Sequence, residues 1–198
     1  VGEHVTKVCV GDKVLLTFTF CGACTACRAG HPAYCDFHLP RNLFGGRRPD
    51  GTTTVSAGGA EINAHFFGQS SFARHAIADE RNTVVLPSDV SDDEMITFAP
   101  LGCGLQTGAG AILNVLRPGP GSMLVVAGAG AVGLAAVMAA HSTSVGRIVV
   151  VDRIHDRLEL ARTLGATDVV DGSVSDVGAE LSRLTGGSGF QYALDTTG

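Results

Sequence analysis

The second half of the chain alternates short apolar runs with segments in which apolar residues recur at helical spacing. Runs such as 123–127 and 147–152 have the length and β-branched content of buried strands, whereas Val177, Leu181 and Leu184 follow the period of a helix. The pattern predicts strands over residues 123–127, 147–152, 168–170 and 190–194, and helices over residues 132–141, 157–164 and 177–184. Strands that alternate with helices in this way are typical of a parallel, doubly wound α/β sheet.

The first half is richer in predicted strands and loops. Apolar and polar residues alternate over residues 14–20, after a turn at Gly11-Asp12, which predicts a strand with one apolar face. Residues 66–78 and 84–86 predict further strands. The stretch 42–64 is rich in Gly, Arg, Pro, Asp and Thr, and it predicts a long excursion on the surface.

Two helices are predicted near the middle of the chain, where its character changes. Ser91-Asp-Asp-Glu94 is a capping-box pattern that begins a short helix ending near Pro100. A Gly- and Ala-rich helix follows over residues 103–116. We therefore predict a β-rich domain over residues 1–102 and an α/β domain over residues 103–198, both incomplete.

Composition narrows the classes of function. The chain has 198 residues with a net charge of −5, so a basic surface for nucleic acid is not expected. No apolar run approaches the roughly 20 residues of a membrane-spanning helix, so we expect a soluble, cytoplasmic protein that does not bind membranes. The chain begins with Val and ends just after an apolar run, and we expect it to be an internal piece of a longer protein.

Four cysteines are crowded into the segment 21–35. Their Cys-x2-Cys-x2-Cys-x7-Cys spacing allows four thiolates to surround one tetrahedral Zn²⁺, which makes a closed, structural site. An iron–sulfur cluster is the alternative, because close Cys-x-x-Cys runs also bind such clusters. Cys9 lies between valines and is expected to be a small, buried residue of a strand. The predicted zinc ligands are Cys21, Cys24, Cys27 and Cys35.

A Gly-x-Gly-x-x-Gly motif follows the predicted strand 123–127 and begins the predicted helix 132–141. This is the context in which the motif binds the pyrophosphate of a dinucleotide. Asp152 ends the next strand, where a carboxylate can bind the ribose hydroxyls of NAD and repel the 2′-phosphate of NADP. The alternative is a structural turn with Asp152 in solvent. The expected coenzyme-binding residues are Gly128, Gly130, Ala131, Val132, Gly133 and Asp152, together with Arg153 beside it.

Cys103 lies apart from the other cysteines, at the predicted domain junction. A single cysteine before a helix is more often a buried core residue than a ligand.

Taken together, these motifs resemble those of the zinc-dependent medium-chain alcohol dehydrogenases, and the resemblance extends along the whole chain. The resemblance implies a partial GroES-like catalytic domain followed by a partial Rossmann domain. It also implies that Cys103 is a ligand of a catalytic zinc and that Thr107 lies near the nicotinamide.

The resemblance implies reversible, NAD-dependent oxidation of an alcohol to an aldehyde by zinc-assisted hydride transfer. The segments 42–51 and 65–73 are most similar to aryl-alcohol (benzyl alcohol) dehydrogenases. A glutathione-dependent formaldehyde or polyol dehydrogenase of the same family is the alternative enzyme. Small-molecule alcohols and aldehydes are the expected partners, and the family resemblance implies a homo-oligomer, a dimer or tetramer, for the full-length protein.

One departure from the family pattern limits what these residues can do alone. The family's other catalytic-zinc ligands, a Cys and a His in a Gly-His-Glu segment, lie upstream of residue 1. None of the seven histidines occupies that position, so we expect residues 1–198 to be inactive by themselves. A non-catalytic zinc module that binds protein or nucleic acid is the rival from another class. The basic residues near the cysteines are more consistent with a solvated loop face: Arg28, Arg41, Arg47 and Arg48.

Overall fold

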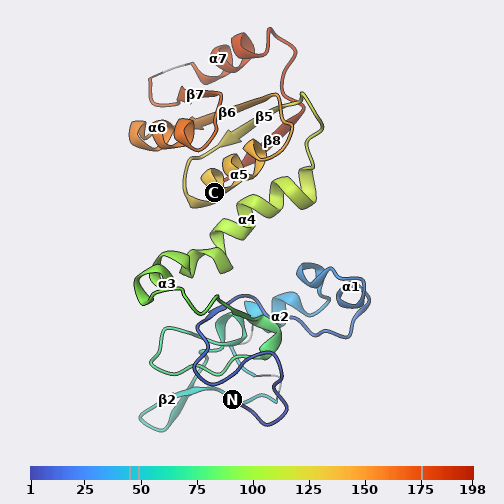
Figure 1. Ribbon diagram of the computed structural model, residues 1–198, viewed down its shortest axis with the longest axis vertical. Helices are drawn as coiled ribbons and strands as arrows, with labels where there is room; N and C mark the ends of the chain where they lie inside the picture. The colour runs from blue at the N-terminus through green and yellow to red at the C-terminus, as the bar shows by residue number, and fades with distance from the viewer. Residues whose placement is uncertain (45, 49, 175) are drawn as a thin grey trace. The chain divides into compact units, whose positions relative to one another are not determined.

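The computed structural model describes residues 1–44, 46–48, 50–174 and 176–198. Its contacts divide the chain into two compact units, Val1–Gly102 and Cys103–Gly198. Figure 1 shows the elements of both.

The second unit is built on a parallel sheet. Its strands are β5 (Met123–Ala127), β6 (Arg147–Asp152), β7 (Asp168–Asp171) and β8 (Tyr192–Asp195). They lie in the order β7-β6-β5-β8, and every adjacent pair is parallel. The predicted doubly wound α/β fold is therefore confirmed.

The connecting helices are α5 (Ala131–His141), α6 (His155–Thr163) and α7 (Val177–Leu184). Figure 1 shows α5 and α7 on opposite sides of the sheet. Leu124 and Val126 of β5 are fully buried, and together with alanines of α5 they form the core of the unit. Burial of these apolar side chains is the main stabilising contribution, at about 25 cal/mol per Å².

The helix α4 (Gly104–Gly110) continues without interruption into a π-helix, η5 (Ala111–Leu116). Together they cover the single helix predicted for residues 103–116. Gly108 is buried where α4 packs on α5. A Cβ atom at this position would lie 2.0 Å from the carbonyl oxygen of Val132, so only glycine allows this approach of the two helices.

The first unit has little regular structure. The strand β1 (Val14–Leu16) pairs antiparallel with β4 (Thr83–Val85), and β2 (Val55–Ala57) forms a hairpin with β3 (Ala60–Ile62). The remaining elements are short helices: α1 (Thr25–Arg28), η1 (Pro32–Tyr34), α2 (His38–Asn42), η2 (Phe66–Gly68), η3 (Glu80–Asn82), α3 (Asp92–Phe98) and η4 (Ala99–Gly102). The capping box predicted for α3 is present, because the Ser91 side chain accepts from the Glu94 N–H and the Glu94 side chain accepts from the Ser91 N–H.

Two strand predictions in this unit are wrong. The strand predicted over 14–20 ends at Leu16, because beyond it the Thr19 N–H donates to the Asn42 side chain at 2.8 Å rather than to a strand. Residues 66–78 form no strand. They begin with the short helix η2, inside which Phe67 has a φ of 52°, and continue as turns and loop. Strand propensity there is overridden by tertiary contacts.

Two burial predictions also need correction. Cys9 is exposed and lies in a turn, where its N–H donates to Asp12 Oδ2 at 2.7 Å. The predicted surface excursion 42–64 is mostly exposed, but Asn42 is only 2% exposed. Its side-chain amide donates to the carbonyl oxygens of Thr19 and His38, so it joins α2 to the chain that precedes the cysteines. Positions 45 and 49 of the excursion lie outside the described residues.

The lengths of the described helices bear on whether the chain could cross a membrane. No single one of them is long and apolar enough to cross a membrane. The consecutive helical stretches 92–102 and 104–116 are together long and apolar enough to do so, by length and composition only.

The contact at Gly108 yields a stability prediction. Gly108→Ala places a methyl group against the backbone of α5, and we expect the free energy of unfolding to fall by about 1–3 kcal/mol or more. Gly110→Ala in the same helix is the control, since its Cβ would meet no atom nearer than 3.7 Å and alanine raises helix propensity. Urea unfolding followed by circular dichroism measures both. Equal stability of the two variants would contradict the tight packing of α4 on α5.

Candidate zinc and coenzyme sites

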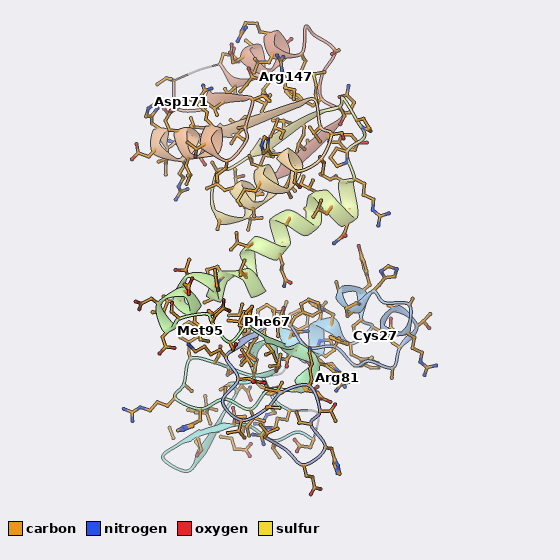
Figure 2. All side chains as sticks on the ribbon, viewed as in Figure 1. Cys27, Phe67, Arg81, Met95, Arg147 and Asp171 are labelled. Atoms are coloured by element: carbon orange, nitrogen blue, oxygen red, sulfur yellow. The ribbon has the colours of Figure 1, made fainter. Side chains whose placement is uncertain are left out.

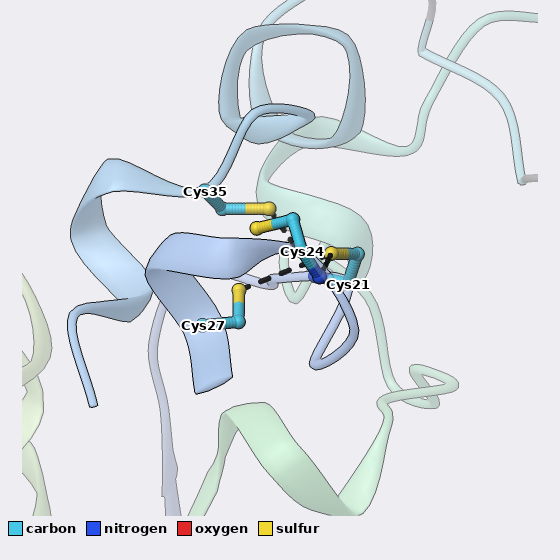
Figure 3. Close-up of side chains that lie close together, drawn as sticks. All are labelled: Cys21, Cys24, Cys27 and Cys35. Atoms are coloured by element: carbon cyan, nitrogen blue, oxygen red, sulfur yellow. Dashed lines mark hydrogen bonds between the residues drawn. The ribbon is translucent and has the colours of Figure 1, made fainter. Parts of the chain in front are cut away.

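The four cysteines predicted as zinc ligands converge in the first unit. Cys21 precedes α1, Cys24 caps it, Cys27 lies within it and Cys35 follows η1. Their sulfur atoms all lie within 4.8 Å of one another (Figure 3). Four thiolates at this separation suit one tetrahedral Zn²⁺ with Zn–S bonds of about 2.3 Å. An iron–sulfur cluster would need room for several irons and sulfides between the thiolates, so the geometry favours the single ion.

Backbone N–H groups donate hydrogen bonds to two of the four sulfur atoms. The N–H groups of Ala23 and Cys24 donate to Cys21 Sγ at 3.4 and 3.3 Å, and the Cys21 N–H donates to Cys35 Sγ at 3.3 Å. The bonds from Ala23 and Cys24 lower the pKa of Cys21 to about 6, whereas burial raises the pKa of Cys27 to about 12. Cys21 therefore ionises more readily than Cys27, and metal binding requires both as thiolates.

Arg81 connects this cysteine lobe, residues 21–35, to the rest of the unit (Figure 2 labels Arg81 and Cys27). Its Nη1 donates to the carbonyl oxygen of Cys21 at 2.7 Å, while its Nη2 and Nε donate to the Asp79 carboxylate at 2.6 and 2.9 Å. The bond from Arg81 also lowers the pKa of Asp79. Gly22 allows the approach, since a Cβ there would lie 2.9 Å from Arg81 Nη1.

Sequence reasoning missed Arg81 as part of this site. Its separation from Cys21 by sixty positions left no local pattern to find. The only sequence signal for Arg81 was the Asp79-x-Arg81 pair just before β4. Such a pair is equally typical of exposed ion pairs that belong to no site.

The glycine motif lies between β5 and α5, as predicted. Gly128 has a φ of 93°, which favours glycine. At Gly133, in the first turn of α5, a Cβ would lie 1.9 Å from the carbonyl oxygen of Gly128, so only glycine allows this approach. Gly130 has no atom within 4 Å of its Cβ position, so the backbone is open to a ligand. Ala131 and Val132 are the first residues of α5, where backbone N–H groups suit a pyrophosphate.

Asp152 is tied into the same turn. Its Oδ2 accepts from the Ala129 N–H at 2.6 Å, and its Oδ1 accepts from the N–H groups of Arg153 and Ile154 at 2.7 and 2.9 Å. Partial burial opposes ionisation, but these donors lower the pKa of Asp152 below its usual value. The carboxylate is therefore charged and fixed in place, which argues against the alternative of a turn residue that is merely solvated.

A cavity of about 690 Å³ opens beside this turn. Gly128, Asp152, Arg153, Ile154 and Val177 are among the residues that line it. The charged side chains of Asp152 and Arg153, the apolar side chains beside them and the open glycine turn form a surface that fits a nucleoside with its phosphates.

Cys103 and Thr107 lie one helical turn apart in the second unit. Cys103 caps the N-terminus of α4 and is exposed, so in the described chain it is not a packed core residue. The Thr107 hydroxyl donates to the Cys103 carbonyl oxygen at 2.9 Å. Within the described residues, the four-cysteine lobe is the only place where three or more potential metal ligands converge. Cys103 therefore offers a single thiol.

The contacts of Arg81 predict how firmly the lobe holds zinc. We expect Arg81→Gln to release zinc roughly tenfold faster, because a charge-assisted hydrogen bond to the Cys21 carbonyl is lost. Arg28→Gln is the control, since Arg28 is an exposed residue of the same lobe without a side-chain bond to a cysteine. Zinc transfer to a metallochromic dye gives both rates. Identical release from the two variants would show that Arg81 does not hold the lobe.

Two family models match the chain. Residues 1–88 match the alcohol dehydrogenase GroES-like domain, and residues 131–198 match the zinc-binding dehydrogenase model. The two matches correspond to the expected partial GroES-like and Rossmann-type folds.

Individual relatives agree with these models. The chain is 42% identical over 199 residues to a geraniol dehydrogenase of Castellaniella defragrans. Among solved structures, it is similar to a zinc-binding alcohol dehydrogenase domain protein from Burkholderia ambifaria, at 44% identity and a TM-score of 0.89. It is also similar to a benzyl alcohol dehydrogenase from Acinetobacter calcoaceticus, at 42% identity and a TM-score of 0.87.

Each of these three comparisons covers 100% of this chain and 52% of the relative, so the chain spans about half the length of these relatives. NAD is the typical coenzyme of this group, and the four-cysteine lobe fits a zinc ion. The chain belongs to the zinc-dependent medium-chain alcohol dehydrogenase family.

Proposed function

We propose that the protein containing this chain oxidises a primary, aromatic alcohol to its aldehyde with NAD⁺. The observation that carries the proposal is the pairing of a fixed Asp152 carboxylate at an open glycine turn with an exposed Cys103 thiol at the start of α4. Relatives named geraniol dehydrogenase and benzyl alcohol dehydrogenase support a primary alcohol as the substrate.

The residues of this chain have separate tasks in the proposed reaction. Cys103 supplies one thiolate to a catalytic zinc, which is completed by residues outside 1–198. When bound, that zinc supplies Lewis-acid chemistry that lowers the pKa of the alcohol hydroxyl. Thr107 lies one turn further along α4, and it would lie near the nicotinamide ring when the coenzyme is bound. The alcohol gives up one hydride and one proton, so that RCH₂OH and NAD⁺ become RCHO, NADH and H⁺.

The coenzyme is positioned by the second unit. N–H groups at the start of α5 and the turn Gly128–Gly133 hold the pyrophosphate, and Asp152 accepts from the ribose hydroxyls. Arg153 is exposed and lines the same cavity. The proposal also includes a homo-oligomer and a cytoplasmic location for the full-length protein, on the strength of the family resemblance alone.

A substrate comparison tests the proposal. With NAD⁺ and the full-length protein, we expect kcat/KM to be highest for benzyl alcohol, lower for geraniol and lowest for ethanol, with NADH absorbance as the measurement. Preference for hydroxymethylglutathione would replace the proposal by the formaldehyde dehydrogenase alternative. Salt-dependent binding to DNA without any turnover would favour the non-catalytic zinc module.

Residues 1–198 alone are expected to form no NADH. Turnover by them would contradict the proposal that residues outside 1–198 complete the catalytic zinc site.

Asp152 is the residue whose replacement tests coenzyme choice. We expect Asp152→Ala to raise the KM for NAD⁺ about tenfold or more and to weaken discrimination against NADP⁺, because a charge-assisted bond to the ribose and the repulsion of a 2′-phosphate are both lost. Asp171→Ala is the control, since Asp171 ends the neighbouring strand in register with Asp152. Unchanged coenzyme preference in the Asp152 variant would remove it from the ribose site.

Cys103 is tested by separating chemistry from coenzyme binding. In the full-length protein, Cys103→Ala is expected to abolish turnover and to lower the zinc content by one equivalent. The Kd for NADH should stay unchanged. Cys9→Ala is the matched control, because Cys9 is also an exposed thiol but lies in a turn of the first unit. Full turnover by Cys103→Ala would show that its thiol is not a zinc ligand.

A further inference from the structure

A second cavity, of about 580 Å³, lies within the first unit. Its lining includes three arginines, Arg41, Arg47 and Arg48, and the apolar side chains of Phe37, Pro40 and Ile77. Sequence reasoning placed these arginines on a solvated loop face. In the structure Arg41 and Arg48 are only half exposed, and all three line one cavity.

Three arginines and two acidic residues line the cavity, so cationic side chains are in excess there. Of the two acidic residues in its lining, Asp79 is bound in two places by Arg81. Asp50 accepts from the Thr52 N–H and hydroxyl at 3.0 and 2.7 Å.

Among the arginines of the lining, only Arg47 forms an ion pair, with Glu61 at 2.7 Å. Arg48 and Arg41 act on carboxylates of the lining through charge alone, since the charge of Arg48 helps to lower the pKa of Asp50 and that of Arg41 helps to lower the pKa of Asp79. For the guanidinium groups of Arg41 and Arg48, no hydrogen bond to a carboxylate is found within the described residues. These two cations are therefore available to an anion that enters the cavity.

Buried polar atoms at the same place point to a ligand. Arg48 Nε and His65 Nδ1 are both shielded from solvent and have no hydrogen-bond partner among the described residues. Burial, followed by the charge of Arg48, lowers the pKa of His65, so this imidazole is neutral. A buried polar atom without a hydrogen-bond partner destabilises the folded protein, because it has lost its hydrogen bonds to water. An oxyanion bound to Arg48 would relieve this cost.

The apolar side chains of the cavity define the rest of the ligand. Phe37 is 53% exposed and Ile77 is 63% exposed, so neither is packed into a core. Inorganic phosphate has no surface that could cover them. An organic acid with an apolar body would bury both side chains and present its carboxylate to an arginine fork, the geometry that arginine binds best.

We propose that this cavity is a binding site for a small organic carboxylate, with the carboxylate on Arg41 and Arg48 and the apolar body against Phe37 and Ile77. The lining residues all belong to Val1–Gly102, and none is a cysteine of the lobe or part of the coenzyme turn. The site is thus separate from the residues proposed for catalysis, and it does not depend on the proposed alcohol chemistry.

Calorimetric titration of the zinc-loaded, full-length protein with benzoate tests the proposal. NADH is kept saturating throughout, so that coenzyme binding does not contribute heat. We expect saturable binding of benzoate, at least tenfold tighter than that of inorganic phosphate or of uncharged benzamide. Phosphate binding as tight as benzoate binding would overturn the assignment of an organic acid.

Variants decide where the benzoate binds. Arg41→Gln and Arg48→Gln should each raise the Kd at least tenfold, whereas Arg28→Gln, an exposed arginine outside the lining, should leave it unchanged. Ile77→Asp, at an exposed position, tests the same cavity should an arginine variant fail to fold, and it too should raise the Kd at least tenfold. Benzoate affinity that is the same in all variants would place the ligand elsewhere, for example on a catalytic zinc. That result, or an absence of binding, would refute the proposal.

Discussion

The convergence of four cysteine sulfurs is the interaction on which the first unit depends. Among the described residues of Val1–Gly102, Cys35, at 5% exposed, is the one apolar side chain that is buried. The other buried side chains of the unit are polar: Thr19, Asn42, Gln69, Asn82 and Thr83. A segment with so little buried apolar surface gains little from the hydrophobic effect. Its order must come from metal–thiolate bonds and from hydrogen bonds such as those of Asn42 and Arg81.

The second unit is stabilised in the opposite way. Leu124, Val126 and Val150 are fully buried in the sheet, and alanines of α5 pack against them. At Gly108 and Gly133, the absence of a side chain lets two segments of backbone approach more closely than any other residue would permit. The proposed coenzyme site is thus a turn fixed on a buried apolar core, which is how a dinucleotide site can be formed before its ligand binds.

This difference explains which predictions succeeded. Strands and helices of the second unit were predicted within a few residues, because apolar periodicity directly reports burial there. In the first unit the same reasoning extended the strand at 14–20 too far and placed a strand at 66–78, since polar contacts decide the backbone in those places. Asn42 and Arg81 act across long stretches of sequence, and no local pattern marks them. The four-cysteine spacing succeeded because metal geometry, unlike core packing, is encoded locally.

The position of Asp152 has a consequence for redesigning the coenzyme preference. Its two oxygens already accept from three backbone N–H groups, so the residue proposed to bind the ribose also holds the turn in shape. Asparagine would turn an amide N–H toward the Ala129 N–H and create a clash of two donors. Serine or glycine would leave the loop without its acceptors. A single exchange such as Asp152→Ala removes the repulsion of a 2′-phosphate but also the acceptors for residues 129, 153 and 154. A variant that binds NADP⁺ well therefore requires new acceptors in the loop in addition to the loss of the carboxylate.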